Sequence, residues 1–265
     1  MADTQTQQVQ THAQGAVPDE AIDLAVVRVR SVLRLAHEPV LFARVKLTMA
    51  ADPAVEMPAV AQVNVDLNGR PIRAQATATT MRDAIEMLGD KLRIQLERAA
   101  RNWAKIRGSL PVDEPGEWRH QSVPAQRPAY YPRPADDRTV VRHKSYGLPK
   151  LTPDEAIADM ELLDYDFHLF TERSTSQDSV VYRAGAGSGY RLAQVRPKPD
   201  RLGPVAADVS VSELPAPKLA LADAEERLDA FGQPFLFFQN ADSGRGNIVY
   251  HRYDGDYGLI TPVDA

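Results

Sequence analysis

Hydrophobic residues recur every three or four positions in two segments of the N-terminal region, which is the spacing of one face of a helix. The first segment begins at Asp19, directly after Pro18, and the second follows Thr80, which can cap it. Elsewhere in this region, apolar and polar residues alternate, as they do in strands with one buried face. The predicted strands span residues 8–13, 38–50, 59–67 and 70–78.

The last two of these strands are separated by Asn68-Gly69, the preferred two-residue turn of a hairpin. The predicted order of elements is therefore β-α-β-β-β-α. Because each helix has one apolar face, we expect both helices to cover the same side of the sheet. On the second helix this face comprises Ile85, Leu88, Leu92, Leu96, Ala99 and Trp103.

Residues 140–265 carry one pattern of apolar residues twice, at a spacing of 68 residues. "LPKL" at 148–151 aligns with "APKL" at 216–219, and the aromatic residues that follow keep the same spacing. Each copy is predicted to form a strand, a short helix, a strand, a loop, a strand, a turn and a strand. The aligned pairs include Phe167 with Phe235, Phe170 with Phe238, Val181 with Val249, Tyr182 with Tyr250 and, after a one-residue shift, Tyr190 with Tyr257. We interpret this pattern as a duplicated small domain.

Between these regions, residues 109–139 contain six prolines, a composition that buries little surface and predicts an extended linker. The sequence therefore predicts an α+β protein in four parts. They are an N-terminal domain at 1–108, the linker at 109–139, and two C-terminal repeats at 140–203 and 204–265.

Composition narrows the class of protein. Of the 265 residues, 43% are hydrophobic and 25% are charged, as in ordinary soluble globular proteins. No apolar run approaches the roughly 18 residues of a membrane span, and the first residues lack the features of a secretory signal, so we expect a cytoplasmic protein. With no cysteine, the chain has no disulfide, thiolate metal site or cysteine nucleophile.

Several short motifs resemble ligand sites but lack the residues that such sites need. "GAGSG" at 185–189 has neither the following helix nor the lysine of a phosphate-binding loop, so we expect a hairpin turn. Asp254 and Asp256 lack the further oxygen ligands of a calcium loop, and the six histidines are scattered. No nucleophile motif is present. We therefore expect no metal, cofactor, small-molecule substrate or enzymatic activity.

Charge is unevenly distributed along the chain. The formal net charge is −5, but residues 1–108 carry +2 and residues 140–265 carry −6. Basic residues of the N-terminal domain gather on its two predicted helices, beside their apolar faces. Such a surface fits the phosphates of folded RNA, although a solvated face without any partner has the same pattern. The candidate RNA-binding residues are Arg28, Arg30, Arg34, Lys91, Arg93, Arg98, Arg101 and Lys105.

Two segments resemble the C-terminal domain of long-form ribosome hibernation promoting factors. The segment "FLFFQNADSGRGNIVYHRYDGDYGLITP" at 235–262 is similar to the end of that domain, and "VVRHKSYGLPKLTPDEAIADMELLDYDFHLF" at 140–170 is similar to its beginning. Residues 19–107 resemble the N-terminal domain of the same family. The family has a single C-terminal domain, so the duplication is a departure, one that points toward the hypoxia-induced ribosome-associated factor branch.

The resemblance implies a function for the N-terminal domain. In the family, this domain occupies the decoding region of the small ribosomal subunit and blocks access of mRNA and tRNA. The implied partners are the small subunit, with its 16S rRNA and ribosomal proteins, and the 70S ribosome. The eight basic residues would then contact rRNA phosphates, and the protein would silence translation during stress or dormancy without acting as an enzyme.

The resemblance also implies a role for the duplication. In the family, the C-terminal domain pairs with its twin from a second molecule and joins two ribosomes. A partner tethered in the same chain acts at an effective concentration of about a millimolar, so we expect an intramolecular pseudo-dimer, no homodimer, and silencing of 70S monosomes. The residues expected between the copies are Phe167, Phe170, Val181, Tyr182, Tyr190, Phe235, Phe238, Val249, Tyr250 and Tyr257.

Other interpretations stay open. The paired copies can leave a surface for a second molecule, which would produce a ribosome dimer (100S), or the duplicated domain can serve as a protein–protein scaffold with an incidental basic surface. The tyrosines at 250, 253 and 257 can stack on RNA bases instead of packing in a core. Arg142, Lys144 and Arg191 can also touch rRNA, although the acidic balance of this half favours protein contacts.

Overall fold

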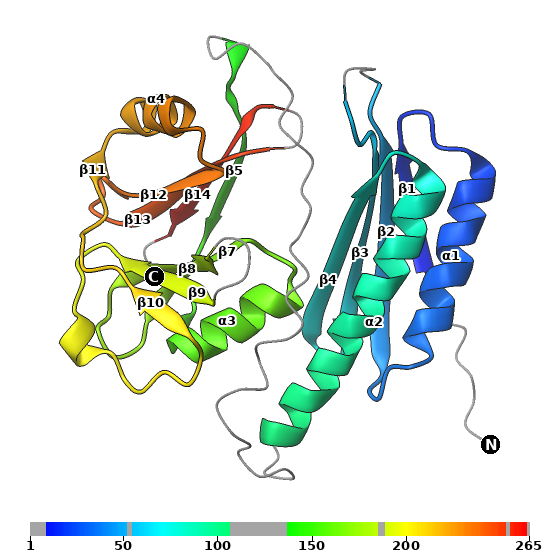
Figure 1. The fold of residues 1–265 in the computed structure, drawn as a ribbon, viewed down its shortest axis with the longest axis horizontal. Coiled ribbons are helices and arrows are strands. Elements are labelled where there is room, and N and C mark those ends of the chain that lie inside the picture. Colours follow the sequence, from blue (N-terminus) through cyan, green and yellow to red (C-terminus); the bar gives the residue numbers. More distant parts are fainter. Residues whose placement is uncertain (1–8, 52–54, 107–136, 185–188, 253–254, 264–265) are drawn as a thin grey trace. The chain divides into compact units, whose positions relative to one another are not determined.

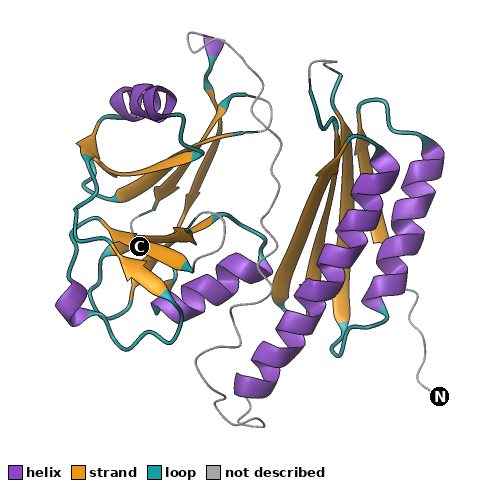
Figure 2. Cartoon of the chain, viewed as in Figure 1, coloured by secondary structure: helices purple, strands orange, loops and turns teal. Residues whose placement is uncertain are grey.

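The computed structural model describes residues 9–51, 55–106, 137–184, 189–252 and 255–263, except for the side chains of residues 102–106. The chain divides into an N-terminal unit and a C-terminal unit that contains both copies of the repeat except for residues 161–165, which group with the N-terminal unit (Figures 1 and 2). Most of the predicted linker, and the predicted "GAGSG" turn apart from its last glycine, lie outside the described residues.

The N-terminal unit has the predicted order of elements, β-α-β-β-β-α, which confirms this part of the fold. Its four strands form one sheet in the order β1-β2-β3-β4, in which β1 is parallel to β2 and the other neighbours are antiparallel. The elements are β1 (Val9–Gln14), α1 (Asp19–Leu33), β2 (Val40–Met49), β3 (Ala59–Leu67), β4 (Arg70–Ala78) and α2 (Met81–Ile106).

Both helices lie side by side on one face of this sheet, as the apolar patterns require (Figure 1). Every second residue of β3 is buried, and these side chains pack with the apolar faces of α1 and α2. Thr80 caps α2, because its hydroxyl accepts a hydrogen bond from the Asp83 backbone N–H at 3.1 Å. Asn68 and Gly69 both have positive φ, at 52° and 85°, as the tight hairpin turn demands.

The C-terminal unit contains two five-stranded sheets, in the orders β10-β9-β8-β7-β6 and β11-β12-β13-β14-β5. The elements of the first copy are β5 (Val140–Tyr146), β6 (Lys150–Leu151), α3 (Pro153–Leu162), β7 (Phe167–Glu172), β8 (Asp178–Arg183) and β9 (Tyr190–Gln194). A short 3-10 helix, η3 (Pro199–Arg201), leads to the second copy. That copy comprises β10 (Val209–Val211), β11 (Lys218–Leu219), α4 (Leu221–Phe231), β12 (Phe235–Asn240), β13 (Gly246–His251) and β14 (Tyr257–Pro262).

The two copies exchange their first strands. β5, which opens the first copy, pairs in parallel with β14 of the second, and β10, which opens the second copy, pairs in parallel with β9 of the first. The predicted repeats at 140–203 and 204–265 are therefore not separate closed sheets, since each gives its opening strand to the other. Without the exchange, β9 and β14 would each present an edge of unpaired backbone groups.

The two sheets also bury apolar side chains against each other. One cluster combines Leu169, Val180 and Val195 of the first copy with Phe237, Ile248 and Ile260 of the second. On the opposite face of its own sheet, the second copy packs Phe238, Val249 and Leu259 under α4. Each copy is thus covered by a helix on one face and by the other copy on the other. Among the helices that the structure describes, none is long and apolar enough to cross a membrane.

The packing between the sheets predicts a strong effect of truncating a leucine there. Leu169 is 1% exposed, so Leu169→Ala should lower the free energy of unfolding of the C-terminal unit by about 3 kcal/mol through lost contacts and a cavity. Leu214, which is 77% exposed, provides the matched control, since Leu214→Ala should change it by less than about 0.5 kcal/mol. Calorimetry of the full chain measures both, and equal effects would contradict the assigned packing.

Candidate nucleic-acid interface and paired C-terminal sheets

Arg28 on α1 joins the two helices of the N-terminal unit. Its guanidinium forms ion pairs with two carboxylates of α2, at 3.0 Å from Glu86 and 2.7 Å from Asp90. Gly89 makes room for this contact, because a Cβ at that position would lie 2.4 Å from Nε of Arg28. The charge predicted to face RNA is therefore compensated inside the protein.

Two further candidates on α2 also have partners within the protein. Lys91 donates a hydrogen bond from Nζ to the backbone oxygen of Gln75 at 2.8 Å, which connects α2 to β4. Arg98 likewise has intramolecular partners. The contact of Lys91 supports the fold of the N-terminal unit before any RNA is bound.

The remaining candidates are more available. Arg30, Arg34 and Arg101 are exposed and form no ion pair among the described residues. Arg93 is exposed and lies 3.6 Å from Glu97 one turn further along α2, a pair of low stability at the surface. The side chain of Lys105 lies outside the described residues.

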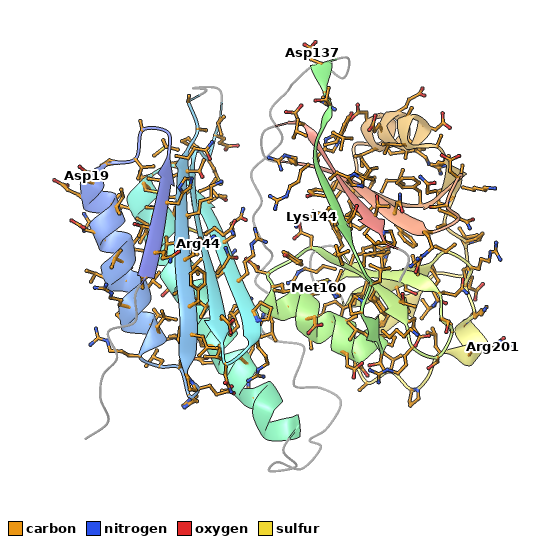
Figure 3. The ribbon with its side chains drawn as sticks, turned by 180° about the vertical axis from the view of Figure 1, so that it is seen from behind. Asp19, Arg44, Asp137, Lys144, Met160 and Arg201 are labelled. Atoms are coloured by element: carbon orange, nitrogen blue, oxygen red, sulfur yellow. The ribbon has the colours of Figure 1, made fainter. Side chains whose placement is uncertain are left out.

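The face of the sheet opposite the helices carries basic residues that the prediction left out. Arg44 and Lys46 on β2 alternate with the buried Ala43 and Val45, and Arg73 on β4 lies on the same face. Arg44, labelled in Figure 3, is exposed. Because residues of β2 alternate between buried and accessible positions, the positive charge of its polar face follows from the sequence pattern.

Side chains on this face are held by polar and aromatic contacts. Arg44 lies 5.1 Å from the ring centre of Phe42 and donates to Oε1 of Gln10 at 3.2 Å. Arg73 donates to Oε1 of Gln62 at 3.2 Å. Guanidinium and amide groups of this kind can donate hydrogen bonds to phosphate oxygens.

Four of the ten residues expected between the copies form one aromatic group there. The rings of Phe167 and Phe235 lie 4.6 Å apart. Phe167 is also 5.7 Å from Tyr250, and Tyr182 is 5.4 Å from Phe235. The last two contacts are equivalent under the repeat, so the copies meet as the halves of a twofold dimer do.

The other six residues do not belong to this aromatic group. Phe238, Val249 and Tyr257 pack under α4, in the core of the second copy. Phe170 and Val181 are fully buried at the equivalent positions of the first copy, and Tyr190 is half-buried on β9. The prediction treated neighbouring positions of each strand as one set, whereas successive side chains of a strand point to opposite faces.

Polar contacts hold the start of the exchanged strand β5 on the second copy. Asp229 of α4 accepts hydrogen bonds from Arg138 and from the hydroxyl of Tyr257. Burial, together with the hydrogen bond to Asp229, raises the pKa of Tyr257 to about 12. The Thr139 backbone N–H donates to Asp256 at 3.3 Å, so this aspartate supports a strand junction. Within the described residues, no group of acidic residues and histidines is arranged to hold a metal ion.

Comparison with known proteins identifies the family. The dormancy associated translation inhibitor of Mycobacterium tuberculosis, from strains CDC 1551 / Oshkosh and ATCC 25618 / H37Rv, is 38% identical over 228 residues. The match covers 83% of this chain and 76% of that protein. This chain belongs to the long-form ribosome hibernation promoting factor family.

Other comparisons concern parts of this chain. The family model "Sigma 54 modulation/S30EA ribosomal protein C terminus" matches residues 135–192 and 209–259, one range in each copy. The ribosome hibernation promotion factor of Picosynechococcus sp. is 28% identical over 156 residues, which cover 57% of this chain and 78% of that protein. The crystal structure of the Thermus thermophilus Protein Y N-terminal domain covers 35% of this chain, with 21% identity and a TM-score of 0.30.

A buried imidazole predicts how the stability of the C-terminal unit depends on pH. Nε2 of His168 on β7 is buried without a hydrogen-bond partner, and burial lowers the pKa of this histidine from 6.5 to about 4. Between these values the unfolded chain binds a proton that the folded chain does not. The free energy of unfolding should therefore fall by about 2 kcal/mol between about pH 7 and about pH 5 through this residue.

The second copy has Leu236 at the equivalent position, which supplies a natural replacement. His168→Leu should remove this part of the pH dependence, whereas the same change at the exposed His143 should preserve it. Urea unfolding at the two pH values measures the difference. If His168→Leu lost as much of its free energy of unfolding between the two pH values as the wild type does, the imidazole would have to be protonated in the folded protein.

Proposed function

We propose that this hibernation factor silences translation by placing its N-terminal unit in the decoding region of the small ribosomal subunit. Bound there, it would exclude mRNA and tRNA by occupancy, without catalysis or a cofactor. Membership of the family supports this proposal, and so do the names of the relatives, a translation inhibitor and a ribosome hibernation promotion factor. A ribosome-bound factor would act in the cytoplasm, during dormancy or a stress such as hypoxia.

The residues proposed to contact 16S rRNA are the exposed ones. Arg30, Arg34 and Arg101 lead this group, because their charges are not compensated among the described residues. Arg93 and Lys105 extend it along α2. Basic side chains of this kind bind phosphates by releasing counterions, so binding would weaken steeply with salt. Arg28 and Lys91 would act mainly by holding the unit together, and Arg98 already has partners within the protein.

The proposed target is the single 70S ribosome. The observation that carries this step is the packing of the two C-terminal copies against each other within one chain, with rings of Phe167 and Phe235 in contact. A surface that is already covered in cis is not available to a second molecule, and the tether favours the cis pair by an effective concentration of about a millimolar. The factor would then not dimerise.

The rival function is a scaffold that binds proteins through the duplicated domain. The acidic balance of residues 140–265 favours it, because acidic surfaces are repelled by rRNA. If a scaffold of this kind also binds ribosomes, that binding should persist when the charge of the basic residues in the N-terminal unit is reversed.

Charge reversal on the N-terminal unit tests the proposed rRNA contact. The triple change Arg30→Glu, Arg34→Glu and Arg101→Glu should weaken binding to 30S subunits by at least about tenfold and flatten its salt dependence. Arg201→Glu reverses an equally exposed arginine of the C-terminal unit and should leave binding unchanged. Equal affinities for the triple variant and the wild type would favour the scaffold.

Sedimentation tests the proposed target. Purified 70S ribosomes mixed with the full-length protein should sediment as 70S particles carrying the protein, because the pairing surface of each chain is covered. Translation of a reporter mRNA by the same ribosomes should fall. A strong 100S peak would overturn the monosome proposal and leave ribosome binding itself intact.

A further inference from the structure

Two contacts show where the axis that relates the two copies passes. Residues that are equivalent in the repeat lie 68 positions apart. Phe167 and its equivalent Phe235 touch directly, and so do Asp178 and its equivalent Gly246, whose N–H donates to Oδ2 of Asp178 at 2.9 Å. Equivalent residues of a twofold dimer touch only on its axis, so both pairs lie on it.

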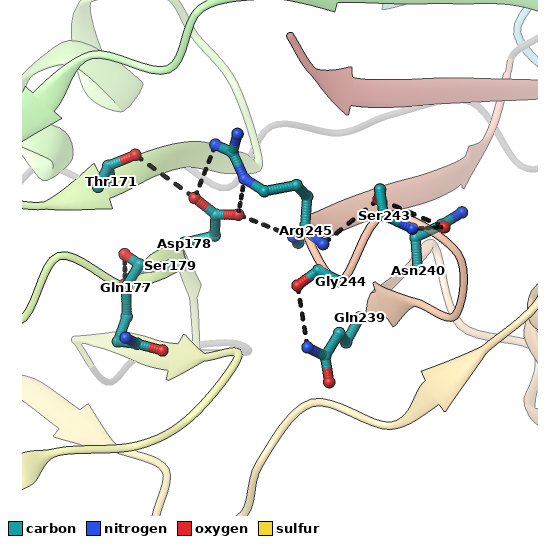
Figure 4. Close-up of polar contacts among 10 residues, drawn as sticks. Thr171, Gln177, Asp178, Ser179, Gln239, Asn240, Ser243, Gly244 and Arg245 are labelled. Atoms are coloured by element: carbon teal, nitrogen blue, oxygen red, sulfur yellow. Dashed lines mark hydrogen bonds and ion pairs between the residues drawn. The ribbon is translucent and has the colours of Figure 1, made fainter. Parts of the chain in front are cut away.

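The aromatic pair on this axis is alike in the two copies, whereas the polar pair differs. Gln177-Asp178 in the first copy aligns with Arg245-Gly246 in the second. The guanidinium of Arg245 makes a bidentate contact with Asp178, with Nε at 2.8 Å from Oδ2 and an Nη at 3.2 Å from Oδ1 (Figure 4). The side chain of Asp178 is 9% exposed, so its charge depends on this partner.

Gly246 is required for the same contact. A Cβ at this position would lie 2.8 Å from the Cβ of Asp178, 2.9 Å from the ring of Phe237 and 3.0 Å from a methyl group of Val195. Real side-chain carbons do not approach so closely. The axis therefore has no room for side chains at both position 178 and position 246.

Pairing between like copies would lose this arrangement, for a different reason in each case. Two first copies would bring Asp178 against Asp178, which places two carboxylates and two Cβ atoms where there is room for one, and supplies no arginine. Two second copies would bring Gly246 against Gly246 and leave each Arg245 guanidinium without the Asp178 carboxylate. Only the unlike pair combines one carboxylate, one guanidinium and one missing side chain.

We infer that Asp178, Arg245 and Gly246 form a specificity device that makes the first copy complementary to the second and not to itself. The interface therefore rejects like copies of another chain by steric conflict and unpaired charge, which adds to the advantage of the tether. A foreign chain can enter only as an unlike pair, with its second copy on this first copy or its first copy on this second copy, and so by reproducing the arrangement within one chain. The inference goes beyond the proposed function and does not depend on ribosome binding.

Two variants of the full-length chain make the copies alike at the axis. Gln177→Arg with Asp178→Gly gives both copies Arg-Gly, and Arg245→Gln with Gly246→Asp gives both copies Gln-Asp. Hydrogen exchange followed by mass spectrometry reports the opening of β8 and β13, and peptides of β3 in the N-terminal unit serve as the internal control. Both variants should lose roughly tenfold or more of the protection of β8 and β13. Wild-type protection in either variant would overturn the inference.

Combining all four changes reverses the device, since the carboxylate then comes from position 246 and the guanidinium from position 177. The reversed chain should regain protection relative to the Gln-Asp chain, although both carry the same side chain beside Phe237. Equal protection in these two chains would show that steric conflict alone explains the loss, and would overturn the specificity device.

If the larger changes prevent folding, a milder pair of variants tests the ion pair between Asp178 and Arg245. Arg245→Gln leaves Asp178 buried without its partner, so it should lose more protection than Asp178→Asn with Arg245→Gln together. An equal or greater loss in the double variant would remove the ion pair from the device. A comparison of Gly246→Ala with Gly147→Ala tests the steric conflict at the axis. Gly147 is the control, because a Cβ there would meet nothing within 4 Å. Equal protection in these two would remove Gly246 from the device.

Discussion

The C-terminal unit depends on two small sheets that bury each other's apolar faces. A domain of this size cannot cover both faces of its sheet alone, and among the described residues each copy has a single α-helix, α3 or α4. The second face is therefore covered by the other copy, through the cluster around Leu169 and Ile248. The exchange of β5 and β10 then couples backbone hydrogen bonding to this packing, so that neither sheet is complete without the other. Folding of one copy thus favours folding of its neighbour.

The N-terminal unit separates two uses of positive charge. Arg28 forms ion pairs with α2 and so holds the two helices together, and Lys91 donates a hydrogen bond to β4 and so holds α2 to the sheet. Arg30, Arg34 and Arg101 remain at the surface, where a polyanion can reach them. All five look alike in a count of charges along a helix. The difference arises from carboxylates and backbone carbonyls that only the folded chain brings near, such as Glu86 beside Arg28.

Features that depend on local pattern could be predicted from the sequence. The alternation in β3, the cap at Thr80 and the Asn68-Gly69 turn each follow from neighbours in the chain, and the N-terminal fold follows from them. The repeat likewise predicted that aromatic residues of the two copies would meet. It did not divide those residues correctly, because the face on which Phe235 or Phe238 lies depends on the register of the strand against its neighbours.

The exchange of strands could not be predicted in this way. "TVVRHKSY" has the composition of a strand, but nothing in it specifies whether β9 or β14 will be its neighbour. The device at the axis was hidden for a related reason. An alignment of the two copies rewards identities, and Gln177-Asp178 against Arg245-Gly246 is a mismatch, although a mismatch is what an asymmetric contact requires.

Because the linker leads directly into β5, the exchange also determines how mechanical load enters the C-terminal unit. Traction from the N-terminal side acts directly on the second copy, through the pairing of β5 with β14 and the contact of Arg138 with Asp229 on α4. A force that pulls on the two ends of the chain would therefore act on the pairing between the two copies.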